Sequence, residues 1–81
     1  MHKTPSVAHA FGAVVRELRV KAKMTQDELS HRAGLNKNYI GVLELGQRSP
    51  TVATMISISR ALHVPLKTFA DKLDKQLKAP Q

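Results

Sequence analysis

The stretch TQDELSHRAGLNKNYIGVLELGQRSP, from Thr25 to Pro50, decides the fold of this chain. It opens with Thr25 three residues before Glu28, which is the pattern of a capping box. In a capping box, each of the two side chains accepts a hydrogen bond from the backbone N–H of the other residue at the start of a helix. Gly34 stands where such a helix commonly ends, because glycine adopts the left-handed conformation of a helix end at little cost. The beginning of the stretch therefore predicts a short helix over residues 26–33.

A second short helix is predicted after a brief turn. Asn36 is a favourable residue for the cap of this helix. Gly46 ends the helical pattern, and Pro50 prevents its continuation. These signals predict a helix over residues 37–45 whose N-terminal end carries polar side chains.

The spacing between these two helices is that of a helix-turn-helix. With Gln26 counted as position one, the fifth position is the small Ser30 and the ninth is Gly34. The fifth position must be small because the second helix crosses close to it, and the ninth position turns the chain. Positions four, eight, ten, fifteen and eighteen form the shared apolar core, and they are Leu29, Ala33, Leu35, Ile40 and Leu43. Seven positions in register make this a strong indication.

Three further helices are predicted from apolar residues at intervals of three and four. The first covers residues 7–22, the second starts after its cap Thr51, and the third begins beyond Val64 and Pro65. Their inward residues are Ala8, Phe11, Val15, Leu18 and Ala22; Met55, Ile58, Ser59 and Leu62; and Leu66, Phe69, Leu73 and Leu77.

The chain is expected to be a single, compact all-α domain of five helices joined by tight turns. The domain covers residues 8–78, with a flexible arm at residues 1–7 and a frayed tail at residues 79–81. A chain of 81 residues buries only a modest core, so a large internal cofactor site is not expected.

The chain is strongly basic, with a formal net charge of +7 from 13 Lys and Arg against 6 Asp and Glu. A small basic domain suits a polyanionic partner, with nucleic acid first and an anionic membrane surface second. A basic surface that serves only solubility is the alternative. One Tyr and no Trp give little support to stacking on single-stranded bases.

Residue content excludes or disfavours several classes of site. The lack of cysteine excludes disulfides, thiolate zinc sites and thiol catalysis. The histidines show no metal-ligand spacing, and the six acids are too scattered to hold Mg²⁺. We therefore expect no metal, no cofactor and no enzymatic activity. No apolar run reaches the length of a membrane helix and no secretory signal is seen, which predicts a cytoplasmic protein with no membrane partner.

The run from Phe11 to Phe69 resembles the lambda-repressor-like, or XRE-type, helix-turn-helix DNA-binding domain. The resemblance is carried by Phe11-Gly12, Arg16, Arg19, Thr25-Gln26, Leu29, Gly34-Leu35-Asn36, Tyr39-Ile40, Glu44, Gly46, Arg48, Pro50, Ala61-Leu62 and Val64. The chain departs from the family pattern at Lys23, Ser30, Ser59 and the Gly41-Val42 pair. The last departure alters the surface that would read a target sequence. Small stand-alone members of this family include controller proteins of restriction–modification systems and phage-type repressors.

The resemblance implies a bacterial or phage-type transcriptional regulator that binds double-stranded DNA as a homodimer on a palindromic operator. The helix over residues 37–45 would enter the major groove with its N-terminal residues against the edges of the bases. The candidates for base contact are Asn36, Lys37, Asn38, Gly41 and Val42. Lysine can donate to guanine, asparagine can pair with adenine, valine can contact a thymine methyl group, and glycine lets the backbone approach closely. A solvated surface without a partner is the alternative.

Four residues around this helix are candidates for contacts with DNA phosphates. Gln26 opens the preceding helix, where backbone N–H groups and its own amide can hold a phosphate. Tyr39, Gln47 and Arg48 could hold the same or adjacent phosphates, and Arg48 is the cation of the loop that follows the glycine stop.

Glu44 is an acid on the helix that is expected to face DNA. In the family this acid pairs with an arginine late in the first helix, which here is Arg19. Such a pair would fix the two helices together and hide the carboxylate from phosphates. An exposed Glu44 without a partner is the alternative.

The last two helices carry apolar residues for which we expect contacts in a homodimer. They are Ile56, Leu66, Phe69, Leu73 and Leu77. A simple extension of the core is the structural alternative. The functional alternative is an antitoxin or adaptor that binds a partner protein through the same two helices and autoregulates its operon.

Overall fold

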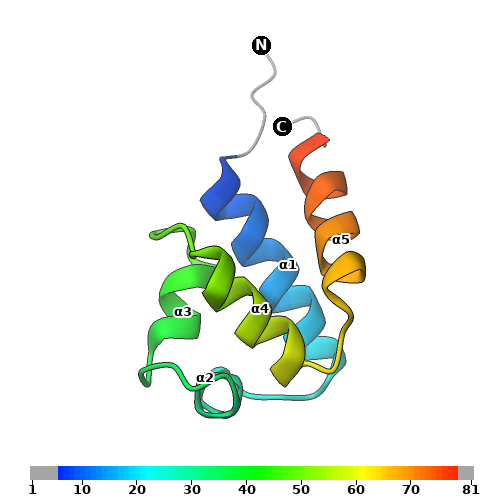
Figure 1. Cartoon of the computed structure of the whole chain (residues 1–81). Coiled ribbons are helices and arrows are strands. Elements are labelled where there is room, and N and C mark those ends of the chain that lie inside the picture. Colours follow the sequence, from blue (N-terminus) through cyan, green and yellow to red (C-terminus); the bar gives the residue numbers. More distant parts are fainter. Residues whose placement is uncertain (1–5, 79–81) are drawn as a thin grey trace.

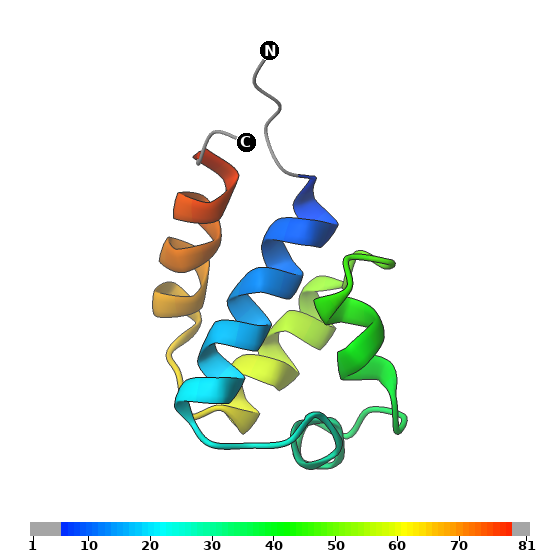
Figure 2. The ribbon, with the colours of Figure 1, turned by 180° about the vertical axis from the view of Figure 1, so that it is seen from behind.

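The computed structural model describes residues 6–78, and in this range it contains five α-helices and no strand. The helices are α1 (Val7–Lys21), α2 (Gln26–Arg32), α3 (Tyr39–Glu44), α4 (Val52–Ala61) and α5 (Leu66–Lys78). Helix α1 lies between α3 and α5, as Figure 1 and the reverse view in Figure 2 both show. The five-helix, all-α fold predicted from the sequence is confirmed.

The first helix begins inside the predicted N-terminal arm. Val7 is the first residue of α1, and Ser6 caps the helix by accepting a hydrogen bond from the backbone N–H of His9 at 3.1 Å. The remainder of the predicted arm and the predicted tail at residues 79–81 lie outside the described residues.

The capping box predicted at the start of α2 is present. The backbone N–H of Thr25 donates to Oε1 of Glu28, and the backbone N–H of Glu28 donates to Oγ1 of Thr25, each at 3.0 Å. The hydrogen bond from the Thr25 backbone lowers the pKa of the Glu28 carboxyl group, because it favours the charged form. Thr51 caps α4 as predicted, and its Oγ1 accepts from the backbone N–H of Thr54 at 3.1 Å.

The start of α3 differs from the predicted helix over residues 37–45. The residue before α3 is Asn38, whose backbone is left-handed with φ of 62°. Asparagine tolerates this conformation better than most residues, but a left-handed residue cannot continue a right-handed helix. Helix α3 therefore begins at Tyr39, and the prediction that Asn36 caps it is wrong. Lys37 and Asn38 belong to the turn that leads into α3.

The turns after α1 and α4 place non-glycine residues in the same left-handed region. Lys23 and His63 each have φ of 58°, while Gly34 and Gly46 take φ of 71° and 72° after α2 and α3. Lys23 stands where the resembling family often has glycine, and its backbone conformation explains that preference. A side chain at such a position costs about 1 kcal/mol relative to glycine.

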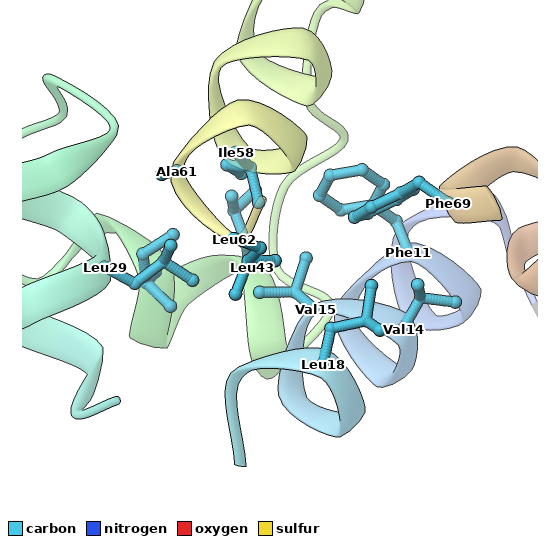
Figure 3. Packing of buried hydrophobic residues seen from close by; sticks show 11 residues of the cluster. Phe11, Val14, Val15, Leu18, Leu29, Leu43, Ile58, Ala61, Leu62 and Phe69 are labelled. Atoms are coloured by element: carbon cyan, nitrogen blue, oxygen red, sulfur yellow. The ribbon is translucent and has the colours of Figure 1, made fainter. Parts of the chain in front are cut away.

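All five helices contribute to one hydrophobic core. Phe11 of α1 and Phe69 of α5 are among its largest buried side chains, and their ring centroids lie 5.2 Å apart (Figure 3). Paired aromatic rings of this kind add to the stability gained from burial. Because Phe69 is 0% exposed, its side chain belongs to the core of a single protomer, and the prediction that it contributes to a dimer interface is wrong.

Ser30 lies where α3 crosses α2, as the helix-turn-helix spacing predicts. Its side chain is buried, and its Oγ accepts a hydrogen bond from the backbone N–H of Ile40 at 3.4 Å. The first N–H groups of a helix have no partner within the helix itself. Ser30 therefore meets the size limit at this crossing and also provides an acceptor for the first turn of α3.

Helices α1 and α3 come into direct backbone contact at Gly12. A Cβ atom at this position would lie 2.3 Å from the carbonyl oxygen of Leu43 and 3.0 Å from Cα of Glu44. Any side chain at Gly12 would therefore push α3 away from α1.

An ion pair joins the same two helices beside this contact. Nε of Arg19 donates to Oε2 of Glu44 at 2.6 Å, and Nη2 donates to Oε1 at 3.1 Å. Nη1 of Arg19 donates to the carbonyl oxygen of Met24 at 2.9 Å. The hydrogen bond to Glu44 raises the pKa of Arg19. The Arg19 and Glu44 side chains are only 12% and 4% exposed, so the expected pair is present and its carboxylate is hidden from the surface.

We expect Gly12→Ala to destabilise the protein by about 1–3 kcal/mol, because the added methyl group overpacks the contact between α1 and α3. In a helix without such a contact, the same change would stabilise by about 1 kcal/mol. Urea unfolding followed by circular dichroism measures the sign. A variant that is more stable than the wild type would contradict the close contact.

We expect Glu44→Ala to lower the free energy of unfolding by on the order of 3 kcal/mol, because it leaves the largely buried guanidinium of Arg19 without its partner. The matched control is Glu17→Ala, which removes the more exposed pair between Glu17 and Lys72 at 2.6 Å. This control should cost less than about 1 kcal/mol. Equal melting temperatures for Glu44→Ala and the wild type would refute the structural role of the buried pair.

Candidate nucleic-acid interface

The polar residues that lead into α3 lie on the surface. Asn36, Lys37 and Asn38 are all exposed, and they form the turn between α2 and α3. In Figure 1 this turn lies at the edge of the molecule, on the side away from α5. Three of the five residues predicted to contact bases are therefore open to solvent.

Helix α3 presents Gly41 and Val42 on its outward side, because its opposite side packs in the core. Both residues are partly exposed. Successive residues of a helix are rotated by about 100°. It follows that Glu44 lies on the Gly41 side of the helix and Tyr39 on the Val42 side. The outward surface of α3 therefore has two flanks.

The flank beside Val42 brings several predicted contact residues together around an open concavity. Its volume is about 570 Å³, and its lining is formed by Asn36, Lys37, Asn38, Tyr39, Val42 and Arg48. Gln47 is also exposed, and its backbone N–H donates to the carbonyl oxygen of Val42 at 3.2 Å. Residues predicted to contact bases and residues predicted to contact phosphates thus share one surface, and Arg48 supplies a cation to it.

The flank beside Gly41 is occupied by Gln26 of α2. Nε2 of Gln26 donates to Oε1 of Glu44 at 3.0 Å. A Cβ atom at Gly41 would lie 3.2 Å from Oε1 of Gln26. Gly41 therefore makes room for the Gln26 side chain, which is a role beyond the close approach to bases predicted for this glycine.

The acid of α3 adds little negative charge to this surface, since Glu44 is held by Arg19 and Gln26 and is largely buried. A second arginine of α1 reaches the same carboxylate, because Nη1 of Arg16 lies 3.9 Å from Oε1 of Glu44. Arg16 was not among the predicted contact residues. Its position three residues before Arg19, on the same side of a helix, is the sequence signal that could have identified it.

Four of the five residues predicted for a dimer interface keep exposed surface. Leu66 is 40% exposed, and Ile56, Leu73 and Leu77 are partly exposed. Leu73 also packs against the core. Val52 was not among the predicted residues, but it is 66% exposed and precedes Ile56 by one turn of α4. The spacing of four residues, which places Val52 and Ile56 on one helix face, was the available signal.

The histidines and acids of residues 6–78 include no group of three that could hold a metal ion. His9 lies instead with its Nδ1 2.8 Å from Oγ of Ser6, and His31 and His63 are exposed. His2 is outside the described residues. Over the same range, none of the helices has the length and apolar character needed to cross a membrane.

Comparison with known proteins identifies the family that this sequence matches. Residues 15–69 match the model of a family described as helix-turn-helix. The chain is 38% identical over 64 residues to the uncharacterized HTH-type transcriptional regulator y4dJ of Sinorhizobium fredii, with 75% of this chain and 83% of that protein covered. It is 33% identical over 69 residues to the control protein C.BamHI of Bacillus amyloliquefaciens, with 84% and 85% covered.

A solved structure shows the same fold. The restriction–modification controller protein C.Esp1396I superposes with a TM-score of 0.84 at 24% identity, with 93% of this chain and 99% of that chain covered. The family match spans well over half of the chain and includes the whole of α2, α3 and α4. This chain therefore belongs to the XRE-type helix-turn-helix family.

Proposed function

We propose that this protein is a transcriptional regulator that binds double-stranded DNA sequence-specifically, as a homodimer on a palindromic operator. The observation that supports this most directly is the surface formed by α3 and the turn before it. This surface presents polar side chains and Arg48, while the acid of α3 is buried against Arg19. A helix with such a surface fits the major groove, and hiding the carboxylate avoids repulsion from phosphates.

The proposed base contacts come from the turn before α3 and from its outward side. Lys37 would donate to O6 and N7 of a guanine, and the amide groups of Asn36 and Asn38 would pair with adenine. Val42 would contact a thymine methyl group. Gly41 would sit close to the bases while keeping Gln26 beside α3, since a larger residue would press on that side chain.

The proposed phosphate contacts lie on the two flanks of α3. A helix in the major groove has a sugar–phosphate backbone on each side, and contacts to phosphates fix its depth and register. Tyr39, Gln47 and Arg48 would hold one strand from the Val42 side, where they are exposed or partly exposed. Gln26 would hold the other strand with the second N–H of its amide nitrogen, the first of which donates to Glu44.

A structural neighbour supports the proposed use of this fold. C.Esp1396I has also been solved as a tetramer in complex with its natural 35 base-pair operator. That complex is an example of a protein of this fold bound to duplex DNA. The relatives described as a transcriptional regulator and a control protein support regulation of transcription as the role of such binding.

The proposed dimer contact uses the exposed apolar residues of α4 and α5. Val52 and Ile56 lie on one face of α4, and Leu66 and Leu77 keep exposed surface on α5. Burial of such side chains in a second copy would remove apolar area from water. A two-fold dimer would place two copies of α3 about 34 Å apart, which is one turn of the duplex.

Selection of bound duplexes from a random pool tests symmetry and specificity together. We expect the selected sequences to share a two-fold symmetric site with half-sites centred about 10 base pairs apart. Leu66→Glu should give a monomer by sedimentation and lose the preference for paired half-sites. The control Thr68→Glu, which adds the same charge at an exposed position of α5, should leave both unchanged. A selected pool without a shared sequence would contradict the proposal.

On the selected operator, Lys37→Ala should cost about 1–3 kcal/mol and relax the preference for one base in each half-site. Arg48→Ala should weaken binding to the operator and to unrelated duplexes alike, because a phosphate contact carries no sequence information. Fluorescence anisotropy with labelled duplexes measures both affinities. If Lys37→Ala retains the full preference for the operator, the assigned reading surface is wrong.

A further inference from the structure

Arg16 carries a positive charge that its neighbours do not neutralise. Its side chain is 68% exposed, and its contact with Oε1 of Glu44 is long, at 3.9 Å. That carboxylate already accepts three shorter hydrogen bonds, two from Arg19 and one from Gln26. Two guanidinium groups thus face one carboxylate, and the charge that remains is on the exposed member, Arg16.

The fold places this charge beside the Gly41 flank of α3. Gly12, one helical turn before Arg16, is the point at which α1 touches the backbone of Leu43 and Glu44. The same side of α1 continues through Arg16 to Arg19, because residues three and four apart share a helix face. Through Glu44, the Arg16 guanidinium lies next to the amide of Gln26.

The Gly41 flank needs a cation if it faces a strand of DNA. On the Val42 flank this charge comes from Lys37 and Arg48. On the Gly41 flank, Gln26 is neutral, and all three kinds of nitrogen in Arg19 already donate to Glu44 or to the Met24 carbonyl. Asp27 and Glu28 in the first turn of α2 are exposed acids, and they would repel a phosphate.

We propose that Arg16 is a further phosphate-contacting residue, which binds the DNA strand that passes Gln26. This inference rests on the proposed function, and it assigns a residue of α1, outside the helix-turn-helix itself, to the DNA-binding surface. The guanidinium group suits the role, because its planar set of donors matches two phosphate oxygens at once. Glu44 acts as a positioning residue that keeps both Arg16 and Gln26 on this flank.

The salt dependence of binding distinguishes a phosphate contact from a general effect of charge. We would measure the affinity of the full chain for one unrelated duplex of about 30 base pairs, or three helical turns. Each neutralised phosphate contributes about 0.9 to the slope of log affinity against log salt. Arg16→Ala should therefore make that slope less steep by about 0.9. The loss of affinity caused by the substitution should consequently be roughly eightfold larger at about 0.1 M salt than at about 1 M salt.

The control is Arg60→Ala, which removes the same charge from an exposed position near the C-terminal end of α4. It should leave the slope unchanged, and Arg16→Lys, which keeps the charge, should retain most of it. Equal slopes for Arg16→Ala and the wild type would overturn the role of Arg16 but leave the proposed function standing. Equal decreases in slope for Arg16→Ala and Arg60→Ala would do the same. A wild-type protein that binds no duplex would instead refute the proposed function, and the role of Arg16 with it.

Discussion

The contact between α1 and α3 is the constraint on which the rest of this structure depends. Helix α3 has six residues, a length at which a helix has little stability of its own. Its position is therefore set by tertiary contacts, of which the backbone contact at Gly12 and the pair between Arg19 and Glu44 are the most specific. These contacts fix the rotation of α3 about its axis. The side that faces away from the core, with Gly41 and Val42, follows from that rotation.

Glu44 connects three helices through one carboxylate. It belongs to α3, accepts hydrogen bonds from Arg19 of α1, and accepts another from Gln26 of α2. A carboxylate that is 4% exposed must be paired, because an isolated buried charge is very unfavourable. The same bonds remove negative charge from the surface of a basic protein and orient the Gln26 amide. This buried ion pair thus helps to hold the three helices together and also keeps negative charge off the surface that we propose faces DNA.

The local parts of the fold could be read from the sequence, because their interactions join residues three or four apart. The capping box of Thr25 and Glu28 and the cap at Thr51 are of this kind, and both form as expected. The start of α3 could not be read with the same success. Asparagine serves equally as a helix cap and as a left-handed residue, so the pattern did not reveal that Asn38, rather than Asn36, precedes the helix.

The sequence by itself determined the number of helices and the register of the helix-turn-helix, and the family resemblance implied the pair of Arg19 and Glu44 that the structure contains. Only the tertiary structure decided which apolar residues of α5 are covered, since Phe69 is buried against Phe11 while Leu66 is not. The tertiary structure also decided that Gly41 accommodates the Gln26 side chain and that Arg16 lies near Glu44. The physical reason is that periodicity fixes the direction of a side chain relative to its own helix. Whether that direction meets solvent or another helix depends on residues distant in the chain.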